Sequence, residues 1–272
     1  MTFSIVARSD DGESWGVAVA SKFLAVGSAV PAAVARVGAI ATQAEANVAW
    51  KFLALAHLDD GATAEVAMTR LVEEDDKREH RQAGIVDSEG NAATYTGAEC
   101  FDWAGGVTGP GYAIQGNILT GPEVVEAMEL SWQGSAGQPL ERRLLDALRA
   151  GDEAGGDKRG RQAAALLVVR EDAGYGAGDD VAVDLRVDDH ATPVDELARL
   201  LDLNDLYLTA STEDEKVAMT PELEAEVAGL VQKQGHPDLR SWVGSENYEM
   251  RVADDGSWID RRVLAILRGA TE

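Results

Sequence analysis

The chain has 272 residues, of which 48 are acidic and 24 are basic, so its formal net charge is −24. A surface this acidic repels the phosphates of nucleic acids and of anionic membranes, so the composition excludes the usual binders of both. No apolar run approaches the ~20 residues of a membrane-spanning helix, and the start lacks the basic and apolar regions of a signal peptide. We therefore expect a cytoplasmic protein with no nucleic-acid or membrane partner.

The basic residues are mainly arginine, with 18 arginines against 6 lysines. High negative charge with scarce lysine resembles the composition of proteins from salt-saturated cytoplasms. In that solvent, salt screens self-repulsion and carboxylates keep the surface hydrated. We therefore interpret the charge as a halophilic adaptation to solvent and not as a binding site, with an ordinary acidic protein as the alternative.

The first half of the chain predicts strands that flank a pair of helices. Alternating β-rich residues around a polar turn predict one hairpin at the start of the chain and another that turns at Gly90. Small apolar residues predict a strand over 33–44 that is buried on both faces. Asn47 and Thr63 are expected to cap the two helices, and Gly61 to end the first of them. The predicted segments are 2–21 (hairpin), 33–44 (strand), 47–61 and 63–75 (helices), 81–97 (hairpin) and 111–119 (strand).

The second half predicts two helices, two strands and a further helix. Apolar stripes mark the first two helices, with Pro122 near the start of one and Gly151 as the expected end of the other. A glycine-rich turn over 171–179 separates the two strands. The predicted segments are 121–132 and 140–151 (helices), 161–170 and 180–188 (strands) and 193–208 (helix).

This order of elements favours a layered α+β domain over residues 1–210. Strands and helices occur in separate blocks, which is not the alternation that βαβ units produce. Two antiparallel sheets with helix layers outside would bury the apolar strands on both faces. Residues 211–220 are polar and acidic and are predicted to be a linker. Residues 221–272 predict a small, mainly helical unit that starts with a helix over 221–233.

Common catalytic and ligand-binding signatures are absent from the sequence. There is no P-loop and no G-x-S-x-G nucleophile elbow. The four histidines are scattered, and the single Cys100, which we expect to be passive, allows no intramolecular disulfide. Asp188, Asp189 and His190 are candidate metal ligands, but the end of a strand is the stronger interpretation of that stretch. We therefore expect no metal and no organic cofactor.

Thr2 is the residue that points most directly to chemistry. Methionine aminopeptidases generally remove Met1 when the second residue is small, which would leave Thr2 with a free α-amine. The unperturbed pKa of such an amine is about 7.7–8.0, so the amine can take the proton of its own γ-hydroxyl, directly or through water. One residue then supplies both nucleophile and base for amide hydrolysis. The alternative interpretation is that Thr2 simply begins a strand.

Several separated blocks resemble, in order, the family named domain of unknown function 1028. The blocks are MTFSIVARSDDGESWGVAVASKFLAVGS, VGAIATQAEAN, QGNIL with GPEVV, GGDKRGRQAAALLVV and VDLRVDDH, all within residues 2–208. That family is assigned to the Ntn-hydrolase superfamily. The resemblance therefore implies a four-layer αββα sandwich and a relationship to proteasome β subunits and other amidohydrolases. It implies a class of chemistry and not a substrate.

The matched blocks suggest partners for Thr2 at the end of the second predicted strand. Ser21 and Lys22 would lie beside the start of the first strand, with Ser21 as a candidate substrate-binding residue. An ammonium group at Lys22 would lower the pKa of the Thr2 amine or hydroxyl. A solvated surface lysine is the alternative, and Arg36 is a rival for the cationic role. The stretch VASKFL lacks the acid of the proteasome pattern.

Neutral amides are the candidates for binding the substrate carbonyl. Gln43 and Asn47 follow the predicted strand 33–44 and offer hydrogen-bond donors. Asn117 lies between a strand and the start of a helix, where a side-chain amide or a backbone N–H can stabilise an oxyanion by ~2.7–4 kcal/mol per donor. The alternative for Asn117 is an ordinary turn residue before the helix.

Asp157 and Arg159 follow two glycines that permit close approach of the backbone. Asp157 is a candidate for orienting the Thr2 amine, and Arg159 for binding substrate. Equally, the two side chains could pair with each other and hold their loop. Both interpretations stay open at this point.

The tail of the chain resembles a small peptidoglycan-binding module that often follows this family. The likeness rests on Trp242, Asn247, Tyr248, Trp258 and Ile259. A halophilic archaeal source would not suit a peptidoglycan partner, so we favour a role in packing or in contacts between subunits.

These observations together predict an N-terminal-nucleophile hydrolase that cleaves a C–N amide bond of a small molecule or short peptide through Thr2. A small amide-containing substrate is the expected partner, and we expect a homo-oligomer. Two other classes stay open. One is a non-catalytic protein of the same fold that binds a small ligand in the same cleft, and the other is a structural oligomer.

Overall fold

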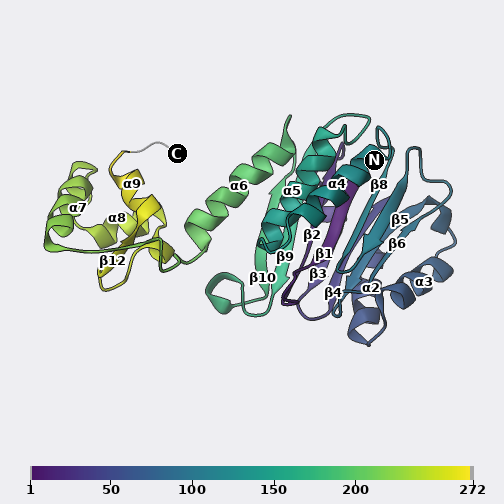
Figure 1. The fold of residues 1–272 in the computed structure, drawn as a ribbon, viewed down its shortest axis with the longest axis horizontal. Coiled ribbons are helices and arrows are strands. Elements are labelled where there is room, and N and C mark those ends of the chain that lie inside the picture. Colours follow the sequence, from purple (N-terminus) through teal and green to yellow (C-terminus); the bar gives the residue numbers. More distant parts are fainter. Residues whose placement is uncertain (1, 270–272) are drawn as a thin grey trace. The chain divides into compact units, whose positions relative to one another are not determined.

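Two antiparallel sheets form the centre of the N-terminal part of the chain in the computed structural model, which describes residues 2–269 (Figure 1). One sheet has six strands in the order β10-β9-β2-β1-β8-β7, and the other has four in the order β3-β4-β5-β6. The first sheet consists of Thr2–Arg8 (β1), Ser14–Ser21 (β2), Gly105–Gly109 (β7), Tyr112–Asn117 (β8), Ala163–Arg170 (β9) and Val181–Val187 (β10). The second consists of Pro31–Val34 (β3), Gly38–Ala44 (β4), Arg81–Asp87 (β5) and Ala92–Thr96 (β6).

Helices cover the outer face of each sheet (Figure 1). Helices α4 and α5 pack on the six-stranded sheet, α2 and α3 pack on the four-stranded sheet, and the inner faces of the two sheets pack on each other. The helices are Val26–Ala29 (α1), Ala49–Asp59 (α2), Ala64–Glu74 (α3), Glu123–Gly134 (α4), Leu140–Glu153 (α5) and Pro193–Leu208 (α6), with short 3-10 turns at Arg78–His80 and Tyr175–Ala177. The predicted α+β class is confirmed.

Alternation along the strands assigns each side chain to a layer. In β1, Phe3 contacts the helical side, where Gly151 of α5 lies close to its ring. The next residue, Ser4, hydrogen-bonds across to β4 of the other sheet. Val6 shares that inner face and belongs to an apolar cluster between the sheets. The layer between the sheets is therefore polar at the Thr2 end and apolar at the other end.

Two local predictions are wrong. Residues 33–44 form the hairpin β3–β4 instead of one strand, and the chain turns at Arg36 in the left-handed region with φ 64°. Gly151 does not end α5, which continues to Glu153. Gly151 is instead buried, and a Cβ there would lie 2.7 Å from a side-chain atom of Met128, so a small residue is needed at this helix contact.

The C-terminal unit has its own core. The chain divides between Arg199 and Leu200, within α6. The unit contains Lys216–Ala218 (β11), Pro221–Lys233 (α7), Leu239–Glu246 (α8), a 3-10 turn at Glu249–Arg251, Trp258–Asp260 (β12) and Arg261–Leu267 (α9). The predicted linker at 211–220 therefore includes a strand, β11, which pairs with β12. Val217 and Met219 of this segment pack against the core of the unit.

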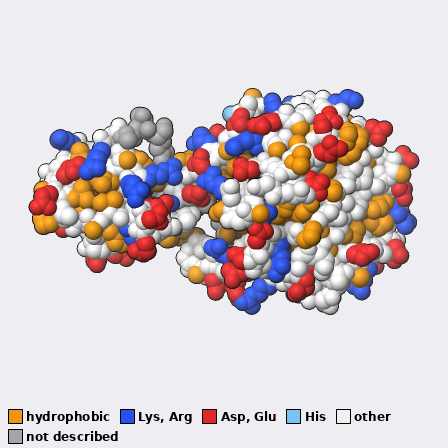
Figure 2. Space-filling view, in the orientation of Figure 1, with side chains coloured by type: hydrophobic (Ala, Val, Ile, Leu, Met, Phe, Trp, Pro, Cys, Tyr) orange, Lys and Arg blue, Asp and Glu red, His pale blue; other side chains and the backbone are white. Residues whose placement is uncertain are grey.

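Figure 2 shows acidic side chains spread over the visible face instead of gathered in one patch. Within residues 2–269, no helix is both long enough and apolar enough to cross a membrane.

Candidate functional site

A row of polar side chains crosses the six-stranded sheet at the start of β1. Thr2 lies opposite Asn117 of β8, and Ser21 of β2 continues the register on the other side of Thr2. Residues directly opposite each other in antiparallel strands share a face of the sheet. Thr2 is only 5% exposed, and its Oγ1 lies 3.1 Å from Oγ of Ser21. The structure therefore brings together three of the residues that the sequence proposes for the site.

The four-stranded sheet places Gln43 against this row. Its Nε2 donates to the carbonyl oxygen of Thr2 at 3.2 Å and to Oε1 of Gln82 at 2.8 Å. Gln82, which is the register partner of Gln43 on β5, also accepts a hydrogen bond from Nδ2 of Asn117 at 2.9 Å. Gln82 therefore joins Gln43 and Asn117 across the gap between the sheets.

The same network continues away from Thr2 through Ser4 and Gln115. Oγ of Ser4 donates to Oε1 of Gln43 at 2.7 Å and accepts from Nε2 of Gln115 at 2.7 Å. These hydrogen bonds satisfy side chains that are almost fully buried. We call the connected set the amide network: Ser4, Gln43, Gln82, Gln115 and Asn117.

Asp157 connects the loop before β9 to the end of β2. Its Oδ2 accepts the backbone N–H of Lys22 at 2.7 Å and lies 3.3 Å from Nη2 of Arg159. Its Oδ1 accepts the backbone N–H of Arg159 at 2.9 Å. Asp157 is buried. It joins its own loop to Lys22, the residue that follows Ser21.

The charged ends of Lys22 and Arg36, the two candidate cations, make their contacts with groups other than Thr2. Nζ of Lys22 donates to the carbonyl of Arg161 at 3.3 Å on an exposed part of the chain. Arg36 pairs with Glu171 and lies before β4, whereas Gln43 lies near the end of that strand. At ~3.3 Å per residue, the turn of Arg36 is roughly 20 Å from the Thr2 end. Arg36 is thus excluded as the cation beside Thr2.

The side chain of Asn47 hydrogen-bonds to Asp75 and to the start of α2. Its Nδ2 donates to Oδ2 of Asp75 at 2.8 Å, and its Oδ1 accepts the backbone N–H of Ala49 near the start of α2. Burial raises the pKa of Asp75, but hydrogen bonds from Arg81 and Asn47 outweigh this effect and lower that pKa to about 2. Both polar atoms of the Asn47 side chain are therefore hydrogen-bonded within the protein, and its role in binding substrate stays a prediction.

Two adjoining pockets open at the Thr2 end. The larger, of about 380 Å³, is lined by Thr2, Gln43 and a mainly apolar wall and is called the Thr2 pocket. The smaller, of about 190 Å³, is lined by Asn117 and is called the Asn117 pocket. Both pockets include Ala44 and Arg159 in their walls. The apolar wall of the Thr2 pocket includes Phe23, Val26, Ala29, Val30, Ala46 and Val48.

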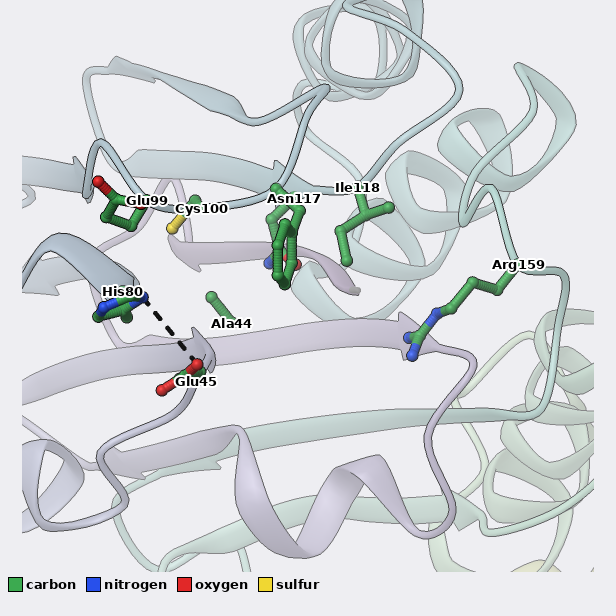
Figure 3. A pocket seen from close by; sticks show the side chains of 9 residues that line it. Ala44, Glu45, His80, Glu99, Cys100, Asn117, Ile118 and Arg159 are labelled. Carbon is green, nitrogen blue, oxygen red and sulfur yellow. Dashed lines mark ion pairs between the residues drawn. The ribbon is translucent and has the colours of Figure 1, made fainter.

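Figure 3 shows the walls of the Asn117 pocket, with Arg159 reaching in from its loop on one side and His80 and Glu45 on the other. Nδ1 of His80 lies 4.0 Å from Oε1 of Glu45. Burial raises the pKa of the Cys100 thiol, and its Sγ donates to the carbonyl of Arg81 at 3.3 Å. A thiol with a raised pKa is a poor nucleophile, so Cys100 is a weaker candidate nucleophile than its place in a pocket wall suggests.

The sequence interpretation missed three members of the amide network, namely Ser4, Gln82 and Gln115. A signal was present, because each is a polar residue on the inner face of an otherwise apolar strand. Among the residues that the structure describes, no group of three or more histidine, cysteine, aspartate or glutamate side chains is placed to hold a metal ion.

The layered sheets and the polar row at one end define an α+β protein with a hydroxyl- and amide-lined site. Residues 2–197 match the model of a family of unknown function, DUF1028, and the chain belongs to that family. Residues 223–267 match the model described as "Putative peptidoglycan binding domain".

A solved structure supports the same assignment. It is the crystal structure of a DUF1028 protein from Silicibacter pomeroyi, whose sequence is 33% identical to this chain. The two structures match with a TM-score of 0.69 over 76% of this chain and 91% of the other. None of the curated proteins matches the chain.

Proposed function

We propose that this chain is an N-terminal-nucleophile amidohydrolase and that its two sheets and helix layers form the αββα sandwich of Ntn hydrolases. One observation carries the proposal. The hydroxyl of Thr2, at the start of β1, lies in the wall of a pocket and within hydrogen-bonding distance of Ser21. A nucleophile whose own α-amine is the base must stand at the start of a chain and beside a substrate-sized cavity.

In the proposed reaction, removal of Met1 frees the α-amine of Thr2. The amine takes the proton of Oγ1 as Oγ1 attacks the amide carbonyl, which gives a tetrahedral oxyanion. When the oxyanion collapses, the C–N bond breaks and the departing amine takes the proton. An ester of Thr2 is left, and a water molecule activated by the same α-amine hydrolyses it to a carboxylic acid.

Asn117 is the proposed donor to the oxyanion. A carboxamide nitrogen carries two N–H groups, and we assign one to Gln82 and the other to the substrate oxygen. Gln82 then acts as a positioning residue, because its Oε1 accepts from Asn117 at 2.9 Å and fixes the plane of that amide. Gln43 has a similar role for the backbone of Thr2 through the 3.2 Å hydrogen bond to its carbonyl.

Asp157 and Ser21 are proposed to orient Thr2 from the other side. Asp157 holds the end of β2 through the backbone N–H of Lys22, and Ser21 is the residue just before. The cationic role of the Lys22 side chain stays a prediction, and its hydrogen bond to Arg161 argues for a smaller part than that of Asp157.

An electrophilic β-lactone probe tests this proposal. We expect the intact mass of the protein from its native host to lack Met1, and the probe to add once, on Thr2. Thr2→Ala should abolish the adduct. Thr69→Ala, which changes a threonine on the exposed face of α3, should leave it unchanged.

A retained Met1, or folded protein whose Thr2 is not labelled, would contradict the hydrolase. Saturable binding of a small amide to such protein would then favour the non-catalytic ligand-binding alternative. The cytoplasmic location, the halophilic origin and the homo-oligomer stay predictions, and an oligomer is tested by sedimentation at several salt concentrations.

A further inference from the structure

The two pockets differ in the groups that line them, and this difference bears on the substrate. The Thr2 pocket is about twice as large and mainly apolar. The Asn117 pocket has charged and hydrogen-bonding groups in its wall, among them Glu45, His80 and Glu99. An amide that reacts at Thr2 therefore has, on one side of its carbonyl, a wall whose only ionisable side chain is Arg159 and, on the other side, a wall that includes several ionisable side chains.

The proposed chemistry decides which half of the substrate enters each pocket. After the C–N bond breaks, the acyl group stays bonded to Thr2 while the amine leaves. The acyl group must therefore fit the pocket that Thr2 itself lines. Since most of that wall is apolar, burial of an apolar acyl chain there is favourable. The amine half is then left to the Asn117 pocket.

Arg159 lies where the two halves meet. Within the described part of the chain, it is the only lysine or arginine in the wall of either pocket, and it is in the wall of both. Figure 3 shows its side chain extending from the loop into the pocket. Asp157 holds the backbone N–H and one guanidinium nitrogen of Arg159, which fixes the direction of the side chain. A guanidinium carries five N–H donors and matches a carboxylate in geometry.

We propose that the substrates are N-acyl amino acids, with the apolar acyl group in the Thr2 pocket and the carboxylate on Arg159. The α-carboxylate of an amino acid is two bonds from the amide nitrogen, so it lies close to the junction that Arg159 occupies. The amino-acid side chain enters the Asn117 pocket. This inference rests on the proposed function, which supplies the position of the amide at Thr2.

Binding to the full-length Thr2→Ala chain tests recognition separately from catalysis. The probes are N-hexanoyl-L-alanine and its neutral counterpart N-hexanoyl-L-alaninamide, measured by calorimetry. We expect the acid to bind at least tenfold more tightly than the amide. Adding Arg159→Gln should abolish this preference, and Arg159→Lys should retain part of it because the charge stays but the forked geometry is lost. Arg149→Gln on α5, whose arginine pairs with Asp146, is the matched control and should change nothing.

The acyl side is tested with the same alanine series. Each additional CH₂ between acetyl and hexanoyl should tighten binding by about fourfold where it is buried. Val48→Asp, a change at a half-exposed part of the wall, should remove that dependence while the fold is retained.

The outcomes separate the two proposals. Equal binding of the acid and the amide, or no effect of Arg159→Gln, overturns the inference. If the preference is found but the wild-type chain never hydrolyses the acid, recognition stands and the proposed function fails. If the wild-type chain hydrolyses other amides without this preference, the proposed function stands and the inference fails.

Discussion

The two ends of the layer between the sheets differ in the side chains that fill them, which are apolar at one end and hydrogen-bonded at the other. Away from Thr2, the layer holds apolar side chains, among them Val6, Val17, Ala39 and Val86. At the Thr2 end, the same strands place the amide network in the same layer. Apolar packing tolerates a range of side chains of suitable volume. A buried amide tolerates little change, because each unsatisfied group costs about 1–3 kcal/mol.

Between the sheets, the chain thus keeps polar side chains at positions where apolar side chains would pack without needing hydrogen-bond partners. A network that is fully satisfied fixes the orientation of each carboxamide. In this protein the fixed groups include Asn117 and the backbone of Thr2, which face the pockets. Rigidity at the polar end therefore serves the site, while the apolar end serves mainly the stability of the fold.

The largest expected effect comes from removing the centre of the amide network. Gln82→Leu keeps the volume but leaves the N–H groups of Gln43 and Asn117 and the carbonyl of Gly116 without the partner they have now. We expect the free energy of unfolding in urea to fall by about 3–5 kcal/mol. Val86→Ala, at the apolar end of the same strand, should cost only about 2 kcal/mol. A larger loss for Val86→Ala would contradict the contrast between the two ends.

A smaller loss is expected from crowding the network without removing a polar group. A Cβ at Gly84 would lie 2.0 Å from Oε1 of Gln115, so Gly84→Ala must displace that carboxamide. We expect a loss of about 2–3 kcal/mol in urea unfolding. The control is Gly134→Ala at the end of α4, where a Cβ meets nothing within 4 Å, and it should be neutral or slightly stabilising.

Lowering the pH distinguishes the amide network from Asp75, because carboxamides do not titrate in this range and the carboxyl group of Asp75 does. The pKa of Asp75 is lowered from 3.8 to about 2 in the folded chain, so its stabilising effect is present above pH 3.8 and is lost as the pH falls toward 2. This shift corresponds to about 2 kcal/mol. Asp75→Asn should therefore be about 2 kcal/mol less stable than the wild type at pH 7, and the gap should close between about pH 4 and pH 2.

Urea unfolding of both proteins across that range measures the gap. Asp60→Asn, at the exposed end of α2, is the control and should stay within about 0.5 kcal/mol of the wild type at every pH. A constant gap for Asp75→Asn would show that Asp75 does not act through its charge.

The smallest effect is expected from adding a polar group to the apolar end. Val6→Thr preserves shape but introduces a hydroxyl into an apolar cluster, two residues along β1 from Ser4. We expect a loss of about 1 kcal/mol in urea unfolding. Val34→Thr on β3, where the side chain is 42% exposed, should have almost no effect. Equal effects at the two positions would mean that the cluster around Val6 readily accommodates a polar group.

Local patterns were sufficient to predict most elements. The hairpin at 2–21 follows from alternation, and Thr63 caps α3 as predicted, because its Oγ1 accepts the backbone N–H of Val66. Helix α7 has the predicted bounds of 221–233. The turn at Arg36 was not predictable from such patterns, because a left-handed arginine inside an apolar run has no local signal.

The site was less predictable because its contacts are distant in sequence. Thr2, Ser21, Asn117 and Gln43 could be singled out as polar residues at the ends of strands. Their assembly depends on strand register, which relates Thr2 to Asn117 and Gln43 to Gln82. Asn47 shows the reverse case, because it is close to Gln43 in sequence but its side chain is hydrogen-bonded to Asp75.

The position of the single cysteine has a practical consequence. Cys100 is in the wall of the Asn117 pocket, and burial raises the pKa of its thiol. Alkylation at neutral pH should therefore be slow, and slower still when a molecule occupies the pocket. The rate at which Cys100 is alkylated therefore reports whether the Asn117 pocket is occupied, so libraries of compounds can be screened for binding by mass spectrometry.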